Sequence, residues 1–365
     1  KYVFKQLNNY RQATDFTGAS LSGLLTSCIG AKTCAIGIID TPKFSNSIAK
    51  KLDVFFVNYP EFKTDFLKNI INSIKKISNP DEFFIEDKNS LWKGKSLYEL
   101  YGEAHTPWEW HEPIMKRANE LGMLCFSSPF DETAVDFLEG LNVPIYKIAS
   151  PEIIHLPLLK KVAATGKPMI ISTGMANLEE ISEAVETAME YGCKDLALLH
   201  CISSYPAPLE QSNLKIIDDL SNKFGLTVGL SDHTIGVIAS ITSVALGASI
   251  VEKHFTLDRS EKGPDSDFSI EPNELSNLCT SAREAWSALG EVGYEKKESE
   301  KENIKYRRSI YVVEDMDPGD IINKENIRRI RPGFGIAPKY FDRVIGRSIN
   351  RKIIKGQPLK WDFIS

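Results

Sequence analysis

No apolar run in the chain approaches the ~18 residues that a membrane-spanning helix needs, so the sequence predicts no membrane span. The opening stretch KYVFKQLNNYRQ lacks the apolar segment of a secretory signal peptide. Basic residues are nowhere concentrated as nucleic-acid binding requires, since the most basic run is the short RRIRPG and the net charge is −5. We therefore expect a cytoplasmic protein with no membrane and no nucleic acid among its partners.

Cysteine pairs at metal-binding or redox spacing are also absent. The six cysteines contain no CxxC pair, and Cys125 and Cys201 lie in or at the end of apolar runs, which favours buried thiols in a reducing compartment. No nucleotide P-loop, GxGxxG or Ser-His-Asp signature is present, so NTP use and acyl transfer have no motif support. The remaining composition is that of an ordinary globular protein, 42% hydrophobic and 25% charged over 365 residues. This length suits two domains, or one large barrel with an appendage.

Short apolar runs recur along the chain and are separated by segments with helix signals. Eight of them carry apolar residues on both faces, as parallel strands covered by helices do: 34–40, 53–59, 123–129, 145–150, 168–173, 196–201, 227–232 and 249–255. Asp131 is the expected cap of one intervening helix, and Asn177, followed by Glu180 three residues later, is the expected cap of another. Eight strand–helix units predict an α/β fold, a (β/α)₈ barrel over residues 1–292.

A change of composition near residue 293 predicts a second domain. Residues 293–306 are charged and nearly free of apolar residues, which is typical of a linker. Residues 307–365 carry short β runs, with turn signals at Pro318-Gly319 and Gly356-Gln357-Pro358, which predict a small, mostly β domain.

A long insert, rich in aromatic and charged residues, precedes the third predicted strand. It covers residues 79–112, and its place on the face where barrel enzymes bind substrates predicts that it covers a substrate. In a strand-like backbone, Trp108 and Trp110 would share one face. We expect both indoles to pack on an apolar part of that substrate.

Polar side chains follow the predicted strands at the point where each strand ends. In a (β/α)₈ barrel these ends meet at one rim, which is where the active site lies. Serines and lysines among them suit a phosphate, and the two imidazoles of His233 and His254, at the ends of neighbouring strands, suit a divalent transition metal. Lys147 and Lys253 stand inside apolar runs, where a buried ammonium requires an anionic partner. For His200, one residue before a strand end, a structural role is favoured.

Eight motifs stand in one order along the chain: SSPFD, YKIASPE, ISTGMA, LLHCISSYPAP, GLSDHT, EKHFT, GPDSDFS and RPGFGIAP. Together they resemble the sialic acid synthase family, the phosphoenolpyruvate-condensing nonulosonate synthases, over about residues 84–365. The stretch LWKGKSLYELYGEAHTPWEWH looks most like the bacterial pseudaminic acid synthase branch. The resemblance implies a (β/α)₈ TIM barrel followed by a small antifreeze-like (SAF, β-clip) domain.

The resemblance also implies a transferase that joins phosphoenolpyruvate to an open-chain N-acetylated aminosugar. With 2,4-diacetamido-2,4,6-trideoxy-altropyranose as the sugar, the products are pseudaminic acid and phosphate. The alternatives are an N-acetylneuraminate or legionaminate synthase, another phosphoenolpyruvate-dependent aldol-type synthase, and a catalytically impaired relative that binds sugar. The implied cofactor is a divalent metal, Mn²⁺ with Mg²⁺ or Co²⁺ as alternatives, which polarises the sugar aldehyde. The implied assembly is a domain-swapped homodimer.

The same resemblance assigns roles to individual residues. Phosphoenolpyruvate would be bound by Ser128, Lys147, Ser150, Ser172 and Ser231. The sugar would be bound by Glu152, Tyr205, Asp265 and Arg331, of which Arg331 would act in the site of a second subunit. His233 and His254 would hold the metal and, with Glu152, form the catalytic set. At Ser203 the sialic acid branch more often has Asn.

Residues 1–80 depart from the family pattern. The family's first barrel strand ends in a catalytic Glu followed by an NHNG-like run, and its second carries a Lys-x-Gln motif that helps to hold the phosphate. Neither motif occurs in residues 1–80, where Asp40 ends the first apolar run and FFVNYPEF has no Lys-x-Gln. We therefore expect a divergent or altered segment here, and the missing motifs are the reason for the alternative of a catalytically impaired relative.

Overall fold

The computed structural model describes the placement of residues 34–39, 54–58, 84–86, 93–97, 100, 106, 108–261, 263 and 265–365; for the first two ranges it describes the backbone alone. The chain divides into two compact units, Lys1–Gly290 and Glu291–Ser365. Within the described residues, no helix has both the length and the apolar character needed to cross a membrane.

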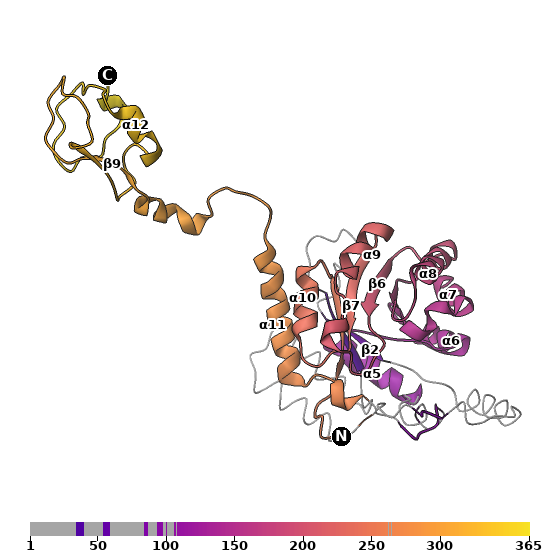
Figure 1. The fold of residues 1–365 in the computed structure, drawn as a ribbon. Coiled ribbons are helices and arrows are strands. Elements are labelled where there is room, and N and C mark those ends of the chain that lie inside the picture. The colour runs from indigo at the N-terminus through magenta and orange to yellow at the C-terminus, as the bar shows by residue number, and fades with distance from the viewer. Residues whose placement is uncertain are drawn as a thin grey trace, which may run out of the picture. The chain divides into compact units, whose positions relative to one another are not determined.

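Eight strands of the first unit close into a barrel in their sequence order (Figure 1). They are β1 (Cys34–Ile39), β2 (Val54–Asn58), β3 (Leu124–Ser127), β4 (Tyr146–Ile148), β5 (Met169–Ser172), β6 (Leu196–Cys201), β7 (Thr227–Asp232) and β8 (Ile250–Phe255). All eight fall within the predicted apolar runs, and β6 and β7 match them end to end. The prediction of an α/β barrel of the (β/α)₈ class is confirmed.

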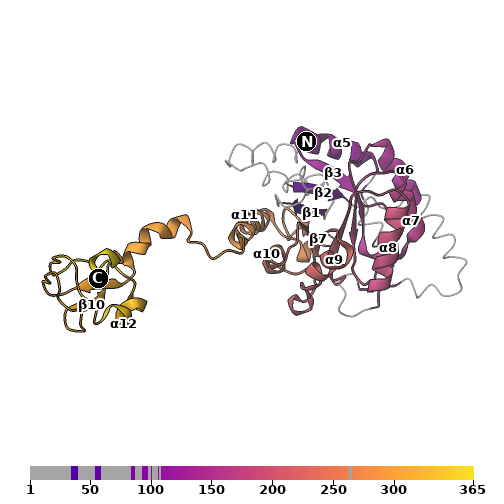
Figure 2. The ribbon, with the colours of Figure 1, turned by 90° about the horizontal axis from the view of Figure 1, so that it is seen from above.

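Helices surround the barrel strands on the outside, as the view from above shows (Figure 2). They are α5 (Trp108–Glu120), α6 (Glu132–Gly140), α7 (Leu156–Ala163), α8 (Leu178–Glu190), α9 (Ile216–Phe224), α10 (Ile238–Ala245) and α11 (Pro272–Leu289). The short 3₁₀ helices η3 (Ser150–Ile154), η4 (Leu209–Gln211) and η5 (Ser266–Phe268) lie in the connections. This alternation places the connections that follow β3 to β8 at one end of the barrel.

The direction of the first strand departs from the expected all-parallel barrel. Strand β1 runs antiparallel to both neighbours, so that Cys34 pairs with Phe255 and Ile39 pairs with Ile250. Strands β2 to β8 are parallel to one another. The pattern of apolar residues is the same when a strand is reversed, which is why it predicted the strand but not its direction. The end of β1 therefore lies level with the beginning of β8, at the opposite end of the barrel from the predicted site.

Side-chain caps begin two of the helices at the predicted residues. The Asp131 carboxylate accepts the backbone N–H of Ala134 at 2.8 Å at the start of α6. The Asn177 side chain accepts the N–H groups of Glu179 and Glu180, and the Glu180 side chain accepts the Asn177 N–H, which completes a capping box at the start of α8. Each cap satisfies N–H groups that the helix itself leaves without partners.

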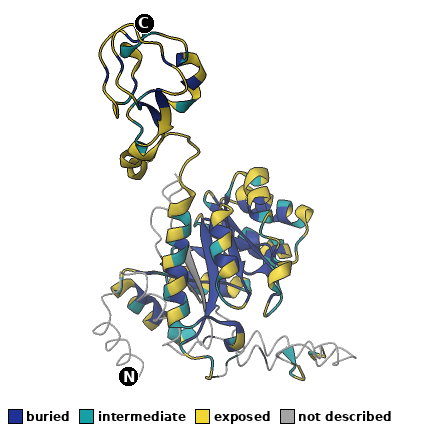
Figure 3. Ribbon diagram, turned by 60° about the vertical axis from the view of Figure 1, so that its left-hand side comes forward, coloured by how far each residue is buried: buried dark blue, intermediate teal, exposed yellow. Residues whose placement is uncertain are grey.

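The hydrophobic core lies between the barrel strands and the inner faces of the helices. Figure 3 shows strands β4 to β8 as buried and the outer faces of the helices as exposed. Strands β4, β5, β6, β7 and β8 are buried at every position, which explains the apolar residues on both faces of their sequences. The four cysteines whose side chains are described are all buried and free: Cys125, Cys193, Cys201 and Cys279.

The second unit has its own small core. Strand β9 (Ser309–Val312) pairs antiparallel with β10 (Ile327–Ile330), and isolated bridges link several shorter extended segments. Ile310, Val312 and Leu359 are among its fully buried residues. Both predicted turns have a glycine with positive φ, Gly319 at 98° and Gly356 at 88°. The unit also holds η6 (Glu298–Tyr306), η7 (Pro338–Tyr340), α12 (Phe341–Val344) and η8 (Trp361–Phe363).

The predicted arrangement of Trp108 and Trp110 is wrong. Both belong to α5, and two residues of a helix are separated by about 200° around its axis, so the two indoles do not share a face. The Trp108 ring stacks on Phe137 of α6 with 4.1 Å between the ring centroids. Trp110 packs against the barrel core. Most of the preceding insert lies outside the described residues, so its predicted role over a substrate stays a prediction.

Gly229 in β7 is expected to tolerate no side chain. A Cβ added there would lie 2.2 Å from the carbonyl oxygen of Ile250 and 2.8 Å from Cδ2 of Leu199. We predict that Gly229→Ala lowers the free energy of unfolding of the barrel by about 3 kcal/mol or more, measured by urea denaturation. Gly140→Ala is the control, because nothing lies within 4 Å of its added Cβ. Equal stability of the two variants would contradict the packing of β7 against β8.

Candidate active site

Two cross-strand pairs at the ends of β7 and β8 organise the site. Ser231 pairs with Glu252, and Asp232 pairs with Lys253. Because side chains alternate along a strand, the first pair lies on one face of the sheet and the second pair on the other. Ser231 donates a hydrogen bond to Oε1 of Glu252 at 2.7 Å. Glu252 also contacts Lys147 of β4, on the far side of the barrel, so the face of Ser231 and Glu252 is the inner one.

The ion pair between Lys147 and Glu252 crosses the barrel interior. The Lys147 ammonium lies 3.5 Å from Oε1 of Glu252 and donates a hydrogen bond to the carbonyl of Ile148 at 3.1 Å. Both side chains are almost fully buried, at 1% and 2% exposure. A charge in such surroundings needs a partner of opposite sign, so the prediction that Lys147 has an anionic partner is confirmed. The partner is a residue that the sequence analysis did not select.

Several hydroxyls around Lys147 are buried. Oγ of Ser150 lies 2.8 Å from Oγ of Ser203, which ties the start of η3 to the loop after β6. Gly174 closes this corner, since a Cβ at that position would lie 2.3 Å from Cβ of Ser150. Oγ of Ser128 and Oγ of Ser172 are buried and find no hydrogen-bond partner among the described residues. Buried hydroxyls are nearly always hydrogen-bonded, so these two indicate a place for a ligand.

Glu152 of η3 has a carboxyl group that titrates near neutral pH. Burial raises its pKa from the ordinary 4.5 to about 7, and the nearby Lys147 ammonium only partly opposes this change. Its Oε2 is buried and has no hydrogen-bond partner within the described part of the chain. A carboxyl with such a pKa exchanges its proton readily at neutral pH, which is a requirement for a general acid or base.

His233 follows β7 directly, and its ring is held in one orientation. Nδ1 lies 2.8 Å from the carbonyl oxygen of Ile202, which can only accept, so Nδ1 carries the proton. Nε2 therefore carries the lone pair. Burial, with a second contribution from the neighbouring His254, lowers the pKa of His233 to about 3. The ring is thus neutral at physiological pH, the form in which imidazole binds metals.

The ring of His254, in β8, lies beside that of His233. The centroids of the two rings are 5.2 Å apart. Nδ1 of His254 is 3.2 Å from Oδ2 of Asp265, so this carboxylate lies directly beside the ring. The Tyr205 ring packs on His233 with 4.4 Å between the centroids and also contacts His254 and Phe268. Tyr205 and Asp265, both predicted to line the sugar site, thus lie against the two imidazoles.

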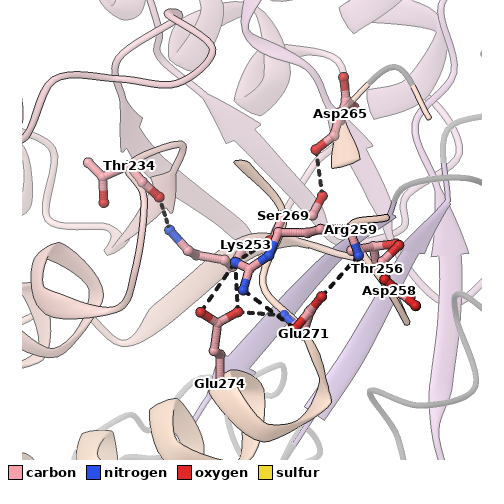
Figure 4. A network of polar contacts seen from close by, with 9 residues as sticks. All are labelled: Thr234, Lys253, Thr256, Asp258, Arg259, Asp265, Ser269, Glu271 and Glu274. Atoms are coloured by element: carbon pink, nitrogen blue, oxygen red, sulfur yellow. Dashed lines mark hydrogen bonds and ion pairs between the residues drawn. The ribbon is translucent and has the colours of Figure 1, made fainter. Parts of the chain in front are cut away.

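Charged groups fix the loop that carries Asp265 (Figure 4). Arg259 contacts two carboxylates at the start of α11, at 3.4 Å to Glu271 and at 3.0 Å to Glu274. Within the loop, the Ser269 hydroxyl donates to the carbonyl of Asp265 at 2.8 Å. Arg259 thus joins the start of the loop to α11, and the Ser269 hydroxyl holds the Asp265 backbone within the loop, beside His254.

His200 has the structural role that the sequence favours. Its Nε2 lies 2.8 Å from the carbonyl oxygen of Ser212, at the end of the connection between β6 and α9. The side chain is buried, and burial lowers its pKa. His200 therefore holds a connection in place and lies on the strand face opposite to that of Cys201.

The predicted site residues of the barrel lie at or just beyond the carboxyl ends of β3 to β8. They are Ser128, Lys147, Ser150, Glu152, Ser172, Tyr205, Ser231, His233, His254 and Asp265. Arg331 belongs to the second unit, where it is exposed just after β10. Asp40 lies outside the described residues.

The sequence analysis missed Glu252, although a Glu inside the apolar run SIVEKHF raises the same question of buried charge as Lys147 does.

The two imidazoles fit a divalent first-row transition metal, a class that includes Mn²⁺. They supply two neighbouring nitrogen atoms, and the neutral state and fixed tautomer of His233 suit coordination. In the part of the chain that the structure describes, no group of three or more His, Cys, Asp or Glu residues is arranged to hold a metal. Among the described residues, His233 and His254 would hold such a metal.

Comparison with known proteins identifies the family. The model of the NeuB family matches residues 62–294, which is more than half of the chain. The chain belongs to the NeuB family. The SAF domain model matches residues 307–365, so the prediction of a SAF domain after the barrel is confirmed. The NeuB match includes every predicted site residue of the barrel, and the SAF match includes Arg331.

Relatives within the family differ in the products that their names give. The pseudaminic acid synthase of Campylobacter jejuni is 40% identical over 289 residues, which are 79% of this chain and 84% of that protein. The N,N'-diacetyllegionaminic acid synthase of Campylobacter jejuni is 42% identical over 315 residues, 85% of this chain and 91% of that protein. A crystal structure of N-acetylneuraminic acid synthetase from Leptospira borgpetersenii, in complex with citrate, is 33% identical with a TM-score of 0.55, covering 65% of this chain and 78% of that one.

Glu152 predicts a specific dependence of stability on pH. The folded protein keeps the Glu152 proton up to about pH 7, whereas the unfolded chain loses it near 4.5. The folded state therefore binds more protons in this window, and the free energy of unfolding falls as the pH rises through it. We expect Glu152→Gln to remove that fall, measured by urea denaturation of both proteins between pH 4.5 and 8. Parallel curves for the two proteins would contradict the raised pKa.

Proposed function

We propose that this protein condenses phosphoenolpyruvate with an open-chain N-acetylated aminosugar, forming a nonulosonic acid and phosphate. One observation carries the proposal: the hydroxyls of Ser128 and Ser172, which find no hydrogen-bond partner among the described residues, are buried at the same rim as Lys147 and the two imidazoles. Hydroxyls and an ammonium suit the phosphate and carboxylate of phosphoenolpyruvate. In the condensation, C3 of the enol attacks the sugar aldehyde, water adds at C2, and phosphate leaves with cleavage of the C–O bond.

The residues of the rim divide this work. Lys147, Ser128, Ser150, Ser172 and Ser231 bind phosphoenolpyruvate and place its C3 toward the sugar. His233 and His254 hold the divalent metal, Mn²⁺ in the first place, which supplies Lewis acidity at the aldehyde when it is bound. The sugar is bound by Glu152, Tyr205, Asp265 and Arg331. Glu152 also moves a proton, because its pKa of about 7 lets it give or take one at neutral pH.

The substrate that we favour is 2,4-diacetamido-2,4,6-trideoxy-altropyranose, which makes the product pseudaminic acid. The support is the resemblance of residues 91–111 to the pseudaminic acid synthase branch. Overall identity does not separate the products, because the relatives named for pseudaminic and for legionaminic acid are similar to this chain at 40% and 42%.

A second candidate is a relative that binds these ligands without condensing them. It is favoured by the direction of β1, whose last residue, Ile39, pairs with Ile250 at the start of β8. The carboxyl end of β1 therefore lies at the opposite end of the barrel from His233 and His254. The proposed enzyme then depends on Glu152 for proton transfer, whereas the second candidate lacks turnover.

We expect the protein to release phosphate from phosphoenolpyruvate in the presence of Mn²⁺ and an aminosugar. The assay compares the trideoxy altrose derivative with N-acetylmannosamine and with the precursor of N,N'-diacetyllegionaminic acid, and the first should have the highest kcat/KM. His233→Ala and His254→Ala should each abolish the metal-dependent activity while the barrel stays folded. Binding of phosphoenolpyruvate without turnover of any sugar would favour the second candidate. If a variant that carries both His233→Ala and His254→Ala binds the metal with unchanged affinity, the assignment of these two residues as metal ligands is wrong.

The small domain is proposed to complete the site of a second subunit in a domain-swapped homodimer. Arg331 is exposed after β10, and its planar guanidinium can hold an amide carbonyl or hydroxyls of a sugar in a fixed geometry. We predict that Arg331→Ala and His233→Ala chains, each inactive alone, recover about a quarter of the activity when mixed as dimers, because one site of each mixed dimer is then intact. The mixing is followed by mass spectrometry. No recovery in dimers shown to contain both chains would reject the exchange.

A further inference from the structure

The outer face of the β7–β8 pair holds a second buried ion pair, directly behind the imidazoles. Oδ2 of Asp232 lies 3.1 Å from Nζ of Lys253, and both side chains are 1% exposed. The two residues are neighbours in register, and each directly precedes one of the histidines. Because side chains alternate in direction, the ion pair lies on the sheet face opposite to that of Ser231 and Glu252.

The remaining polar atoms of the ion pair bind the turn that follows β7. Oδ1 of Asp232 accepts the N–H of Thr234 at 2.8 Å. Nζ of Lys253 donates to the carbonyl of Thr234 at 2.5 Å, as Figure 4 shows. Oδ2 of Asp232 accepts the hydroxyl of Ser240 in α10 at 2.5 Å. One ion pair thus holds both backbone polar groups of Thr234 and connects them to the helix outside the barrel.

These contacts fix the backbone on the carboxyl side of His233. On the other side of the turn, the carbonyl of His233 accepts the N–H of Ala207 at 2.9 Å. The ring itself is held by the carbonyl of Ile202. The imidazole therefore keeps its direction only if the turn keeps its place, and Asp232 and Lys253 hold the turn from behind.

Stability alone is a weak explanation for such a pair. A buried ion pair costs several kcal/mol of desolvation per ion, and apolar side chains of similar volume are often as stabilising or more so. Apolar side chains, however, cannot bind the N–H and the carbonyl of Thr234. The charged pair therefore fixes the orientation of the backbone at Thr234, which an apolar pair would not do.

We propose that Asp232 and Lys253 are positioning residues, which act through Thr234 to orient the His233 imidazole with Nε2 toward the barrel interior. This inference rests on the proposed function for its consequence, because a correctly oriented Nε2 serves metal binding. Both side chains lie on the sheet face opposite to that of Ser231 and Glu252. Residues that orient a metal ligand in this way typically change metal affinity by about 10- to 100-fold when they are replaced.

A double variant separates orientation from stability. Lys253→Met alone leaves the Asp232 charge buried without its cation, so the variant should unfold more easily. Adding Asp232→Asn removes that charge and should restore much of the stability. The donor to the Thr234 carbonyl is still missing, so the orientation defect should persist. Tyr146→Phe is the control, since it removes a buried hydroxyl that contacts Glu139 at 2.8 Å on the outer face of β4.

Two measurements on the protein without substrate test the proposal. The ¹⁵N spectrum of the His233 ring, assigned by comparison with His233→Ala, should show one tautomer in the wild type and the control, with the proton on Nδ1. The double variant should show a mixture of tautomers. The dissociation constant for Mn²⁺, measured by electron paramagnetic resonance, should rise at least about tenfold in the double variant and stay unchanged in the control.

The outcomes distinguish this inference from the proposed function. If the wild type binds no Mn²⁺, the metal assignment fails, but the ring spectrum still tests the orientation of His233. If the double variant keeps the wild-type spectrum of His233, the pair has no positioning role and the inference is overturned. An unchanged Mn²⁺ affinity in the double variant, beside a wild type that binds the ion, also overturns it.

Discussion

The rim of the barrel depends on the neutralisation of two buried lysine ammonium groups, one on each face of the closed sheet. Lys147 is neutralised by Glu252 across the barrel interior, and Lys253 by Asp232 on the outer face. The two carboxylates come from neighbouring strands, Asp232 from β7 and Glu252 from β8. They occupy successive pairs of the register, because Glu252 pairs with Ser231 and Asp232 pairs with Lys253. Removal of one member of such a pair leaves an uncompensated charge and typically costs about 3–5 kcal/mol. The register of β7 and β8 is therefore strongly fixed, and with it the places of His233 and His254.

The two ion pairs have different consequences for the site. The inner pair brings Lys147, Ser231 and Glu252 into contact, close to the hydroxyls that a phosphate-bearing substrate would use. The outer pair holds the backbone after His233. A parallel sheet covered by helices can hold an ion pair on each face, because both faces of its strands are buried. The same register of β7 and β8 brings together the residues on both faces. Substrate binding on the inside and support from the outside thus come from adjacent positions of one strand pair.

Much of this arrangement could be predicted from the sequence, for reasons that also explain what was missed. Apolar runs placed β2 to β8, and side-chain caps such as Asn177 placed the helix starts, because both signals are local. The direction of β1 and the helical state of Trp108 and Trp110 depend on contacts distant in sequence. Lys147 revealed the need for an anionic partner, but the identity of Glu252 follows only from the closure of the barrel, which brings β4 opposite β8.

The central claim is that this rim binds phosphoenolpyruvate through Lys147 and the buried hydroxyls. The most direct measurement is a crystal structure of the protein grown with phosphoenolpyruvate and Mn²⁺. The account predicts the phosphate within hydrogen-bonding distance of Oγ of Ser128 and Oγ of Ser172, the two hydroxyls that lack partners among the described residues. Phosphoenolpyruvate bound elsewhere, with both hydroxyls still without partners, would contradict it.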